Sequence, residues 1–260
     1  MLKGGLIGRC ITRDLKWGTA VPVKGYEKKV FYVWFDAPIG YISITACHNG
    51  ENWKQWWQNQ DNVELYQFMG KDNITFHTVI FPSTLIGSGQ PWTKLHHIST
   101  TEYLNYEKDE ITGAPFKFSK RLGQGVFGDD AIKTGIPSEV WRYYLLTNRP
   151  ENQDTVFTWS DLLAKNNNEL LANLGNFSNR ALKFTKSAFK GIVPGYGQSE
   201  AVPDDQQFLN TLVGKTHQYM ELMEAVKLRD GLKCAMEYSQ ECNGYFQTFK
   251  PWDLIKQAGG

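Results

Sequence analysis

The sequence is short of the features that mark secreted, membrane-spanning and metal-stapled proteins. It has 4 cysteines in 260 residues, namely Cys10, Cys47, Cys234 and Cys242, and none of them forms a C-x-x-C pair. A disulfide framework and a zinc knuckle are therefore poorly supported, and free thiols are the simpler expectation. No apolar run approaches the roughly 20 residues that span a bilayer, and no signal peptide is evident. These absences predict a soluble intracellular protein.

The chain also has no marked excess of charge of either sign, with 28 basic and 27 acidic residues. The formal net charge is +1, so no bulk field draws the chain to nucleic acid or to a membrane. The 5 histidines form no metal set with the cysteines, and no Ser/His/acid or paired-carboxylate spacing indicates a hydrolase. Aromatic residues, in contrast, are abundant, with 9 Trp, 12 Tyr and 15 Phe. A hydrophobic content of 41% then predicts a folded chain with a real core.

Strand and helix patterns alternate in the first part of the chain. Short apolar runs at 30–35, 64–69 and 95–100 predict strands, and the segments 41–46 and 76–86 predict helices. Strands separated by helices indicate an α/β fold with a parallel sheet, and such sheets bind ligands at the carboxyl ends of their strands.

From Pro137 onward the pattern predicts helices. Pro137 and Ser138 are a start signal, and Arg149-Pro150 is a stop. A long helix is expected over 160–191, then a Gly/Pro-rich loop at 195–203, helices at 205–227 and 228–248, and a last turn from Pro251. This region reads as an antiparallel bundle from residue 161. One stripe of the long helix should face its core: Leu163, Leu170, Leu174, Phe177, Ala181, Phe184 and Ala188.

A cationic, glycine-rich segment stands between these regions. It reads Lys117-Phe118-Ser119-Lys120-Arg121 and is followed by glycines at 123, 125 and 128. Glycines let backbone N–H groups approach a phosphate, and lysine is a compact charge on a flexible stem. The pattern indicates phosphate handling, although an ordinary surface loop could have the same composition.

Two further groups fit a small-molecule site. Trp34 and Tyr41 lie seven residues apart around a Pro/Gly turn and could form an apolar slot or simply pack in a core. Asp72 follows a strand at Gly70, where a carboxylate can meet a ribose, and His77 comes shortly after it. A helix cap and a core histidine are the structural alternatives for Asp72 and His77.

The long helix also carries a polar stripe. Between Glu169 and Glu200 there is no acidic residue, so the stripe could be an RNA face with amides that read bases, or a solvated basic surface. Trp252 could stack on an unpaired base or plug the bundle. The adjacent opposite charges Arg13-Asp14 read most simply as solvated surface. The stripe consists of Asn173, Asn176, Arg180, Lys183 and Ser187.

Together these motifs resemble, nearly end to end, a methionyl-tRNA synthetase of the cytosolic eukaryotic type, a class I aminoacyl-tRNA synthetase. The resemblance lies in six segments: 10–18, 30–41, 70–77, the Lys117 loop, 173–180 and 250–252. It implies the second half of a Rossmann-like, parallel-sheet catalytic domain at 1–110 and a signature-loop and stem-contact connection at 111–160. An all-α anticodon-binding bundle is implied at 161–260.

The resemblance implies a cytoplasmic ligase that adenylates methionine with ATP and Mg²⁺ and transfers it to tRNA(Met), with no zinc in this segment. The methionine pocket would be lined by Trp34, Ala37, Pro38, Tyr41, Phe76 and His77. The residues implied for ATP are Gly70, Asp72, Lys117, Ser119 and Lys120, with Lys117, Lys120 and Arg13 in catalysis. The anticodon would be read by Asn176, Arg180 and Trp252. A multi-synthetase complex is implied as a partner of a full-length protein.

The chain departs from this family in two ways. Arg121-Leu122 stands where the family loop has Ser-Arg, and the family's His-x-Gly-His motif and zinc-binding cysteines are absent. We therefore expect an N-terminally truncated chain that is inactive alone, with an incomplete sheet and an exposed apolar edge. Two alternatives remain open: a tRNA-binding module without ligase activity, and a ligase for another apolar amino acid.

Overall fold

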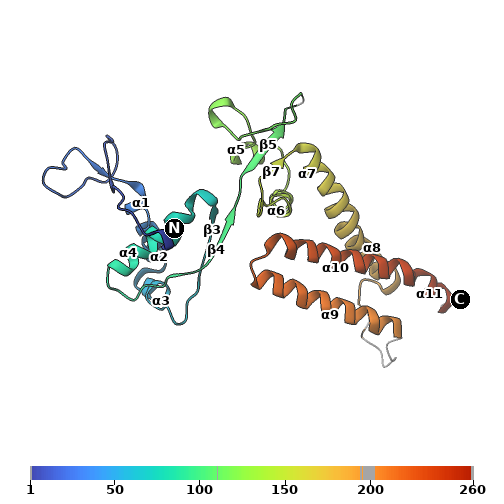
Figure 1. Ribbon diagram of the computed structural model, residues 1–260. Helices are drawn as coiled ribbons and strands as arrows, with labels where there is room; N and C mark the ends of the chain where they lie inside the picture. Colours follow the sequence, from blue (N-terminus) through green and yellow to red (C-terminus); the bar gives the residue numbers. More distant parts are fainter. Residues whose placement is uncertain (1, 110, 194, 196–202, 259–260) are drawn as a thin grey trace. The chain divides into compact units, whose positions relative to one another are not determined.

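The computed structural model describes residues 2–109, 111–193, 195 and 203–258 and divides the chain into two compact units, 1–101 and 102–260 (Figure 1). The first unit is an α/β arrangement and the second joins a small sheet to a helical bundle, so the predicted α/β class with a helical second part is confirmed. None of the helices in the described ranges is both long and apolar enough to cross a membrane.

The predicted strand over 30–35 is wrong beyond its second residue. The strand β2 (Val30–Phe31) pairs antiparallel with β1 (Thr12–Arg13), and the chain then turns into the helix α1 (Val33–Asp36). The ladder ends at Phe31, although the N–H of Tyr32 still donates to the carbonyl of Ile11 at 2.8 Å, and the ring of Phe35 lies 5.1 Å from that of Phe31. The aromatic residues that suggested a strand therefore belong to a helical turn in which the rings of Phe31 and Phe35 contact each other while Phe35 stays 39% exposed.

The parallel sheet predicted for the first unit is present. The strand β3 (Leu65–Gly70) pairs in parallel with β4 (Leu95–Thr101), and Gly70 lies opposite Thr101 at their carboxyl ends. The connection contains η3 (Lys71–Asn73), the π-helix η4 (Phe76–Ile80) and α4 (Phe81–Gly87), so the helix predicted at 76–86 is also confirmed. Phe68 on β3 is 55% exposed, in line with the expected apolar surface.

The helices before β3 complete the core of this unit. The helix predicted at 41–46 is α2 (Ile39–Asn49), followed by η2 (Gly50–Trp53) and α3 (Lys54–Trp57). A short 3-10 turn, η1 (Leu2–Gly4), opens the chain. The buried cluster consists of Trp57, Phe81 and Leu85.

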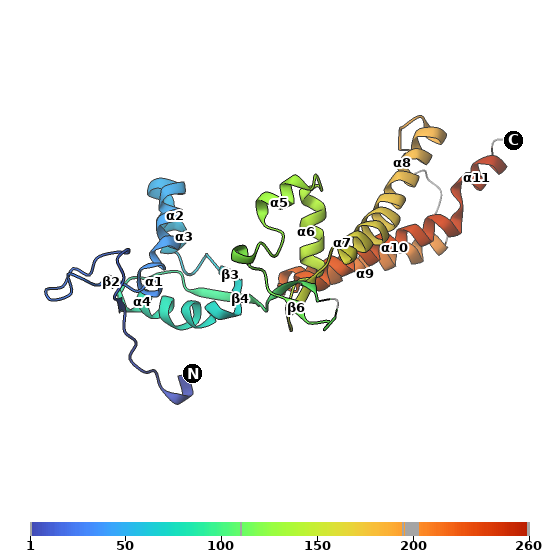
Figure 2. The same ribbon diagram turned by 90° about the horizontal axis from the view of Figure 1, so that it is seen from above.

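The second unit begins with a three-stranded sheet in the order β6–β5–β7. The central strand β5 (Leu104–Lys108) pairs antiparallel with β6 (Pro115–Phe116) and in parallel with β7 (Thr155–Phe157). The elements between β6 and β7 are η5 (Lys120–Leu122), α5 (Gly128–Lys133) and α6 (Ser138–Thr147); Figure 2 shows α5 and α6 beside each other. Their core is Tyr144, Phe157 and Leu162, and burial raises the pKa of Tyr144 to about 12.

The long helix predicted at 160–191 is one helical run of three segments. These are α7 (Trp159–Lys165), the π-helix η6 (Asn166–Gly175) and α8 (Asn176–Phe189). A π-helix bonds i to i+5, so a stripe drawn at the α-helical period drifts off the contact face. Leu163 and Leu174, predicted to be core residues, are consequently 58% and 43% exposed, and Leu162 is buried in their place.

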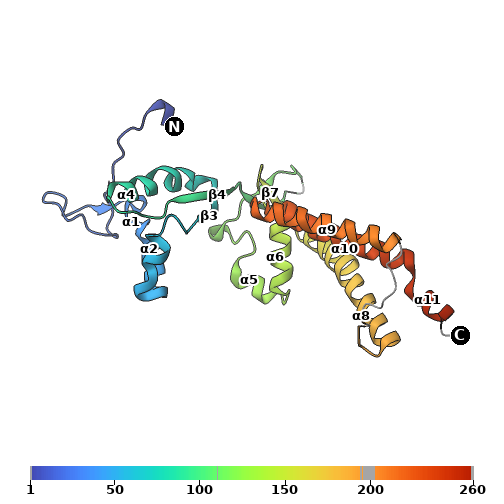
Figure 3. The ribbon, with the colours of Figure 1, turned by 90° about the horizontal axis from the view of Figure 1, so that it is seen from below.

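Three more helices complete the bundle: α9 (Pro203–Glu224), α10 (Leu228–Phe249) and α11 (Pro251–Ala258). These agree with the predicted helices and with the start at Pro251, while most of the loop predicted at 195–203 lies outside the described residues. The helices α9 and α10 run side by side (Figure 3).

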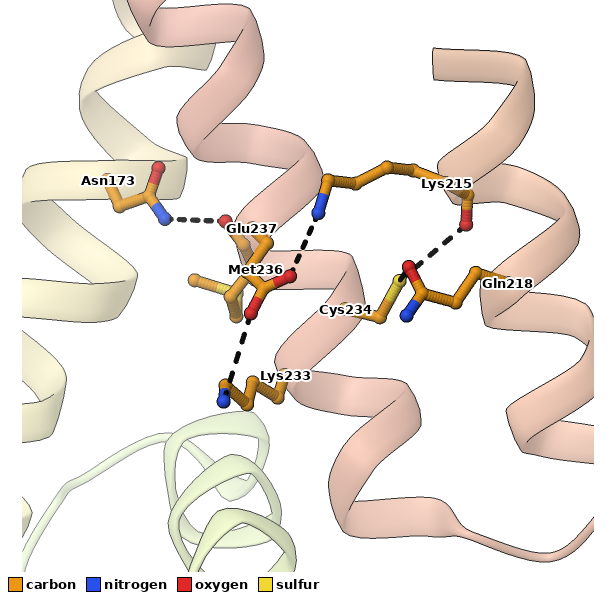
Figure 4. A network of polar contacts seen from close by, with 7 residues as sticks. All are labelled: Asn173, Lys215, Gln218, Lys233, Cys234, Met236 and Glu237. Atoms are coloured by element: carbon orange, nitrogen blue, oxygen red, sulfur yellow. Dashed lines mark hydrogen bonds and ion pairs between the residues drawn. The ribbon is translucent and has the colours of Figure 1, made fainter. Parts of the chain in front are cut away.

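Polar contacts tie α10 to its two neighbours (Figure 4). Lys215 on α9 donates to the Glu237 carboxylate at 2.9 Å, and Lys233 lies 3.9 Å from the same carboxylate. On the other side, the Asn173 amide of η6 donates to the Met236 carbonyl at 2.9 Å. The face of η6 that carries Asn173 is therefore directed into the bundle, and Asn173 does not belong to the exposed stripe predicted from the sequence.

Candidate functional site

An aromatic cluster forms in the first unit where α1, α2 and η4 meet. The ring of Trp34 lies 5.8 Å from that of Phe76, edge to face, and the ring of Tyr41 lies 5.6 Å from that of His77. Phe76 and His77 are buried, at 5% exposure each. Four of the six residues implied for the methionine pocket are thus brought together by three short helices, although not at the end of a strand as expected.

The hydrogen bonds of His77 fix which of its nitrogens carries a proton. Nδ1 lies 2.9 Å from the carbonyl oxygen of Asn73, which can only accept, so Nδ1 donates. In the neutral ring Nε2 then accepts, and it lies 2.6 Å from the hydroxyl of Tyr41. The Tyr41 hydroxyl is therefore held in one direction, and burial raises its pKa, which keeps it protonated.

A hollow of about 710 Å³ lies along α1 and the start of α2, and of the six residues implied for the methionine pocket its lining includes Ala37 alone. Ala37 and Arg13 line it, whereas Pro38 is buried at the start of α2. The Arg13 guanidinium stacks on Tyr32 at 3.7 Å from the ring centroid and donates to the carbonyl of Thr12. Asp14 pairs with Lys29 at 2.7 Å, and its side chain is 82% exposed, as expected of solvated surface.

Gly70 and Asp72 lie at the carboxyl end of β3, where the parallel pair β3–β4 ends. A Cβ placed on Gly70 would meet no atom within 4 Å, so this edge of the strand is open. Asp72 follows in η3 with its side chain exposed. This is the position at which parallel sheets bind nucleotides.

The signature loop, residues 117–125, is a closed turn. The backbones of Ser119 and Gln124 exchange hydrogen bonds in both directions, at 2.8 and 3.0 Å. The ring of Phe118 packs inward against Tyr106, with centroids 5.3 Å apart, and Lys117 and Lys120 stay exposed. The Lys120 ammonium lies 5.8 Å from the centroid of Phe127. The anchored Phe118 thus lies between two exposed cations, Lys117 before it and Lys120 after it.

A third candidate site lies on the helical bundle. Its centre is Arg180 on α8, whose guanidinium carbon lies 5.1 Å from the centroid of Phe246 and 5.5 Å from that of Trp252. Nη2 of Arg180 also donates to Gln247 at 2.8 Å. The cation therefore joins α8 to α10 and α11 and holds the indole of Trp252 beside it.

Next to this cation lies an amide groove of about 540 Å³. It is lined by Asn168, Glu169, Ala172, Asn173, Asn176, Arg180, Gln240, Asn243, Gly244 and Gln247. Gln240, Asn243 and Gln247 were not predicted from the sequence, although their three- and four-residue spacing on α10 was the available signal. The Asn243 amide donates to the Asn173 carbonyl at 2.9 Å, while its buried oxygen has no partner within the described ranges.

The predicted site residues therefore form three groups: the aromatic cluster with the open end of β3, the signature loop, and the cation with its groove on the bundle. The first group belongs to one compact unit and the other two to the second. Convergence of the signature loop on the aromatic cluster stays a prediction. In the described part of the chain, no three His, Cys, Asp or Glu side chains are arranged to hold a metal ion.

Comparison with known proteins places the chain in a class of enzymes. A sequence model of the tRNA synthetases class I (M) matches residues 1–182. The chain belongs to this family.

The curated relatives that match are named methionine–tRNA ligases. A probable methionine–tRNA ligase of Oryza sativa subsp. japonica is 56% identical over 264 residues, and the cytoplasmic methionine–tRNA ligase of Homo sapiens is 51% identical over 255. Each match covers 98% of this chain but only 32% and 27% of the relative. The chain therefore spans about a third of the length of the curated relatives it matches.

Solved structures agree with this assignment. The methionyl-tRNA synthetase of Mycobacterium tuberculosis in complex with methionyl-adenylate superposes with a TM-score of 0.78 at 26% identity. The match covers 98% of this chain and 47% of that one. The prediction of a class I methionyl-tRNA synthetase fold is confirmed.

Proposed function

We propose that this chain carries the methionine-binding, signature-loop and anticodon-binding parts of a cytoplasmic methionine–tRNA ligase. The observation that carries the proposal is the Tyr41–His77 pair set against Trp34 and Phe76, in a chain at least half identical to named methionine–tRNA ligases. The division at 1–110, 111–160 and 161–260 is part of this proposal, as is membership of a multi-synthetase complex.

The aromatic cluster suits a methionine side chain. A thioether is polarizable and packs favourably against ring edges, which Trp34 and Phe76 offer in their edge-to-face arrangement. The Tyr41 hydroxyl, held by His77, is a polar group beside these rings and in this proposal recognises a sulfur or an amino group. Ala37 and Pro38 complete the wall in this proposal.

In the first reaction, a carboxylate oxygen of methionine forms a bond to the α-phosphorus of ATP, and the bond to pyrophosphate breaks. ATP enters as its Mg²⁺ complex. The chemistry needs positioning and neutralisation of charge rather than a protein nucleophile. We assign neutralisation of the phosphate charge to Lys117 and Lys120 with Ser119. Arg13 supports this neutralisation, and Gly70 and Asp72 bind the adenosine.

In the second reaction, a hydroxyl of the 3′-terminal ribose of tRNA(Met) attacks the carbonyl carbon of the adenylate, and AMP leaves. The bundle selects the tRNA in this proposal. Asn176 and Arg180 bind base edges from the amide groove, and Trp252 supplies a ring on which an unpaired base stacks.

The test is methionine-dependent exchange of pyrophosphate into ATP, measured on the protein as its gene encodes it. Lys120→Ala should lower kcat by roughly 100- to 1,000-fold, the usual effect of removing one group that stabilises transition-state charge. Exchange with isoleucine or leucine, but not methionine, would instead indicate a ligase for another apolar amino acid. Exchange that is untouched in Lys120→Ala would contradict the role of the loop.

A second candidate function is a tRNA-binding module without ligase activity. It is favoured by the bundle, which holds Arg180, Trp252 and the amide groove within one compact unit. Silence in pyrophosphate exchange together with retained binding of tRNA(Met) would support this function over the first.

A further inference from the structure

Glu107 occupies a backbone conformation that glutamate rarely adopts. Its φ is 46°, in the left-handed region that favours glycine and, among other residues, asparagine and aspartate. The other non-glycine residues with positive φ in the described ranges, Lys190, Val226 and Lys250, all follow helix ends, where this conformation is common. Glu107 instead lies inside the central strand of a sheet.

The cause is a bulge at the base of the signature loop. Tyr106 pairs with Phe116 and Lys108 pairs with Pro115, so Glu107 is the extra residue on β5. The strand opposite it, β6, runs directly into Lys117. A bulge bends its strand and re-aims the neighbouring side chains. The one strained residue of this sheet therefore lies where the loop begins.

The carboxylate of Glu107 reaches the start of the long helical run. Oε1 accepts a hydrogen bond of 2.9 Å from the backbone N–H of Trp159, the first residue of α7. An N–H in the first turn of a helix has no partner within the helix, and a carboxylate is favoured there by the helix dipole. Thr158 satisfies a different donor, the N–H of Asp161. The bond from Glu107 is therefore not duplicated by the helix cap.

Ring contacts carry the same connection into the loop. The indole Nε1 of Trp159 donates to the hydroxyl of Tyr106 at 3.3 Å, and the ring of Tyr106 packs against Phe118 at 5.3 Å. Phe118 directly follows Lys117 and lies two residues before Lys120, so its packing anchors the backbone between the two exposed lysines of the loop. Tyr106 also stacks on Phe157 at 5.8 Å, which belongs to the buried core.

We propose that Glu107 is a positioning residue for the signature loop: by bonding the N-terminus of α7 from a strained bulge, it fixes the strand pair from which Lys117 and Lys120 project. This inference rests on the proposed function for its catalytic consequence. Glu107 touches no reacting atom in it, and acts only through β6 and Phe118.

The experiment compares three variants of the full-length protein. Glu107→Gly removes the carboxylate and also relieves the backbone strain, so it should not destabilise the fold. Glu107→Gln retains an oxygen that can accept from Trp159. Glu139→Ala, an exposed glutamate in the first turn of α6, is the control for loss of a surface charge.

In pyrophosphate exchange, Glu107→Gly should lower kcat roughly tenfold, since a misplacement of about 1 Å can cost as much as a hundredfold. KM for methionine should be unchanged, Glu107→Gln should recover most of kcat, and Glu139→Ala should match the native protein. Amide hydrogen exchange over 117–127 should be faster in Glu107→Gly alone, at an unchanged Tm. A general structural role would not give this split between kcat and KM.

Failure of this proposal can be told from failure of the proposed function. If the native protein exchanges no pyrophosphate but the loop amides still exchange faster in Glu107→Gly, the ligase assignment falls and the positioning role stands. Native kcat and native amide exchange in Glu107→Gly would overturn the positioning role. Equal losses of kcat and Tm in Glu107→Gly and Glu107→Gln would overturn it as well.

Discussion

Replacing Arg180 by alanine should separate tRNA recognition from methionine activation. The guanidinium contacts two aromatic rings, Phe246 and Trp252, and donates to Gln247. Its removal takes away a cation that can bind a base edge and also releases the indole of Trp252 from its neighbour. Both losses fall on the bundle and leave the aromatic cluster of the first unit intact.

The size of the effect follows from these contacts. One charged base contact contributes about 1–3 kcal/mol of discrimination, and each cation–π contact near the surface adds about 0.5–1 kcal/mol of order to the ring beside it. The base contact alone should therefore lower the affinity for tRNA(Met) about 5- to 150-fold, because every 1.4 kcal/mol is a factor of ten, and loss of the two cation–π contacts adds to this effect. Pyrophosphate exchange should stay within about twofold, since Arg180 and the aromatic cluster belong to different compact units and their contacts are separate.

The assay is a binding titration with tRNA(Met) and with a tRNA whose anticodon has been changed. Lys183→Ala is the matched control, because Lys183 lies on the same helix, is exposed and carries the same charge. It should weaken both tRNAs equally, as loss of a phosphate contact does. Arg180→Ala should weaken the native anticodon more. Equal weakening of both tRNAs by both variants, or a matching loss of pyrophosphate exchange in Arg180→Ala, would refute the assignment of Arg180 to base recognition.

Three further variants and one control variant test the aromatic cluster, the loop and the bundle. Tyr41→Phe leaves the buried Nε2 of His77 without its 2.6 Å partner, which should cost about 1–3 kcal/mol and raise KM for methionine; an unchanged Tm and KM would contradict the role of the pair. Gly125→Ala places a Cβ 2.4 Å from Cδ1 of Phe118 at a φ of 134°, so pyrophosphate exchange should fall about tenfold or more. Gly123→Asn is the control. Gly123 has a φ of 62° and open space around it, so this variant should keep most of the exchange activity. The Lys215 hydrogen bond lowers the pKa of Glu237, so this carboxylate stabilises the bundle above its unfolded pKa and stops doing so as pH falls through its folded pKa. Glu237→Gln should therefore lower Tm by about 1–3 °C at neutral pH, and it should leave Tm unchanged at a pH below the folded pKa of Glu237. The loss is small because the Lys215–Glu237 pair is partly exposed. An equal loss of Tm at both pH values would contradict this account.

The sequence was most informative where local pattern and tertiary structure agree. The strands at 65–70 and 95–101, the helix start at Ser138 and the start at Pro251 follow from periodicity and punctuation, and the structure has them. The run 30–35 misled because β-branched and aromatic residues fit any half-buried surface. The short partner strand β1 (Thr12–Arg13) decides where the extended chain ends and the helix α1 begins.

The candidate sites divide in the same way. Trp34, Tyr41, Phe76 and His77 were found as residues, but their contact depends on three short helices meeting, which no spacing in the sequence encodes. Glu107 could not be found at all, because its bond to Trp159 joins positions 52 residues apart through a bulge. Long-range pairing, rather than residue type, is what the sequence left open.

The π-helix η6 accounts for the composition of the amide groove. An α-helical continuation from α7 would keep the stripe of Asn173, Asn176 and Arg180 on one exposed face, as the sequence predicts. The wider turn instead directs Asn173 into the bundle, where its side chain donates to Met236 and its carbonyl accepts from Asn243. Asn243 is thereby fixed at the groove beside Gln247, which accepts from Arg180. Asn173 thus lines the groove while it holds α10 amides next to the cation, so the groove is built from two helices and its polar groups are ordered before a ligand arrives.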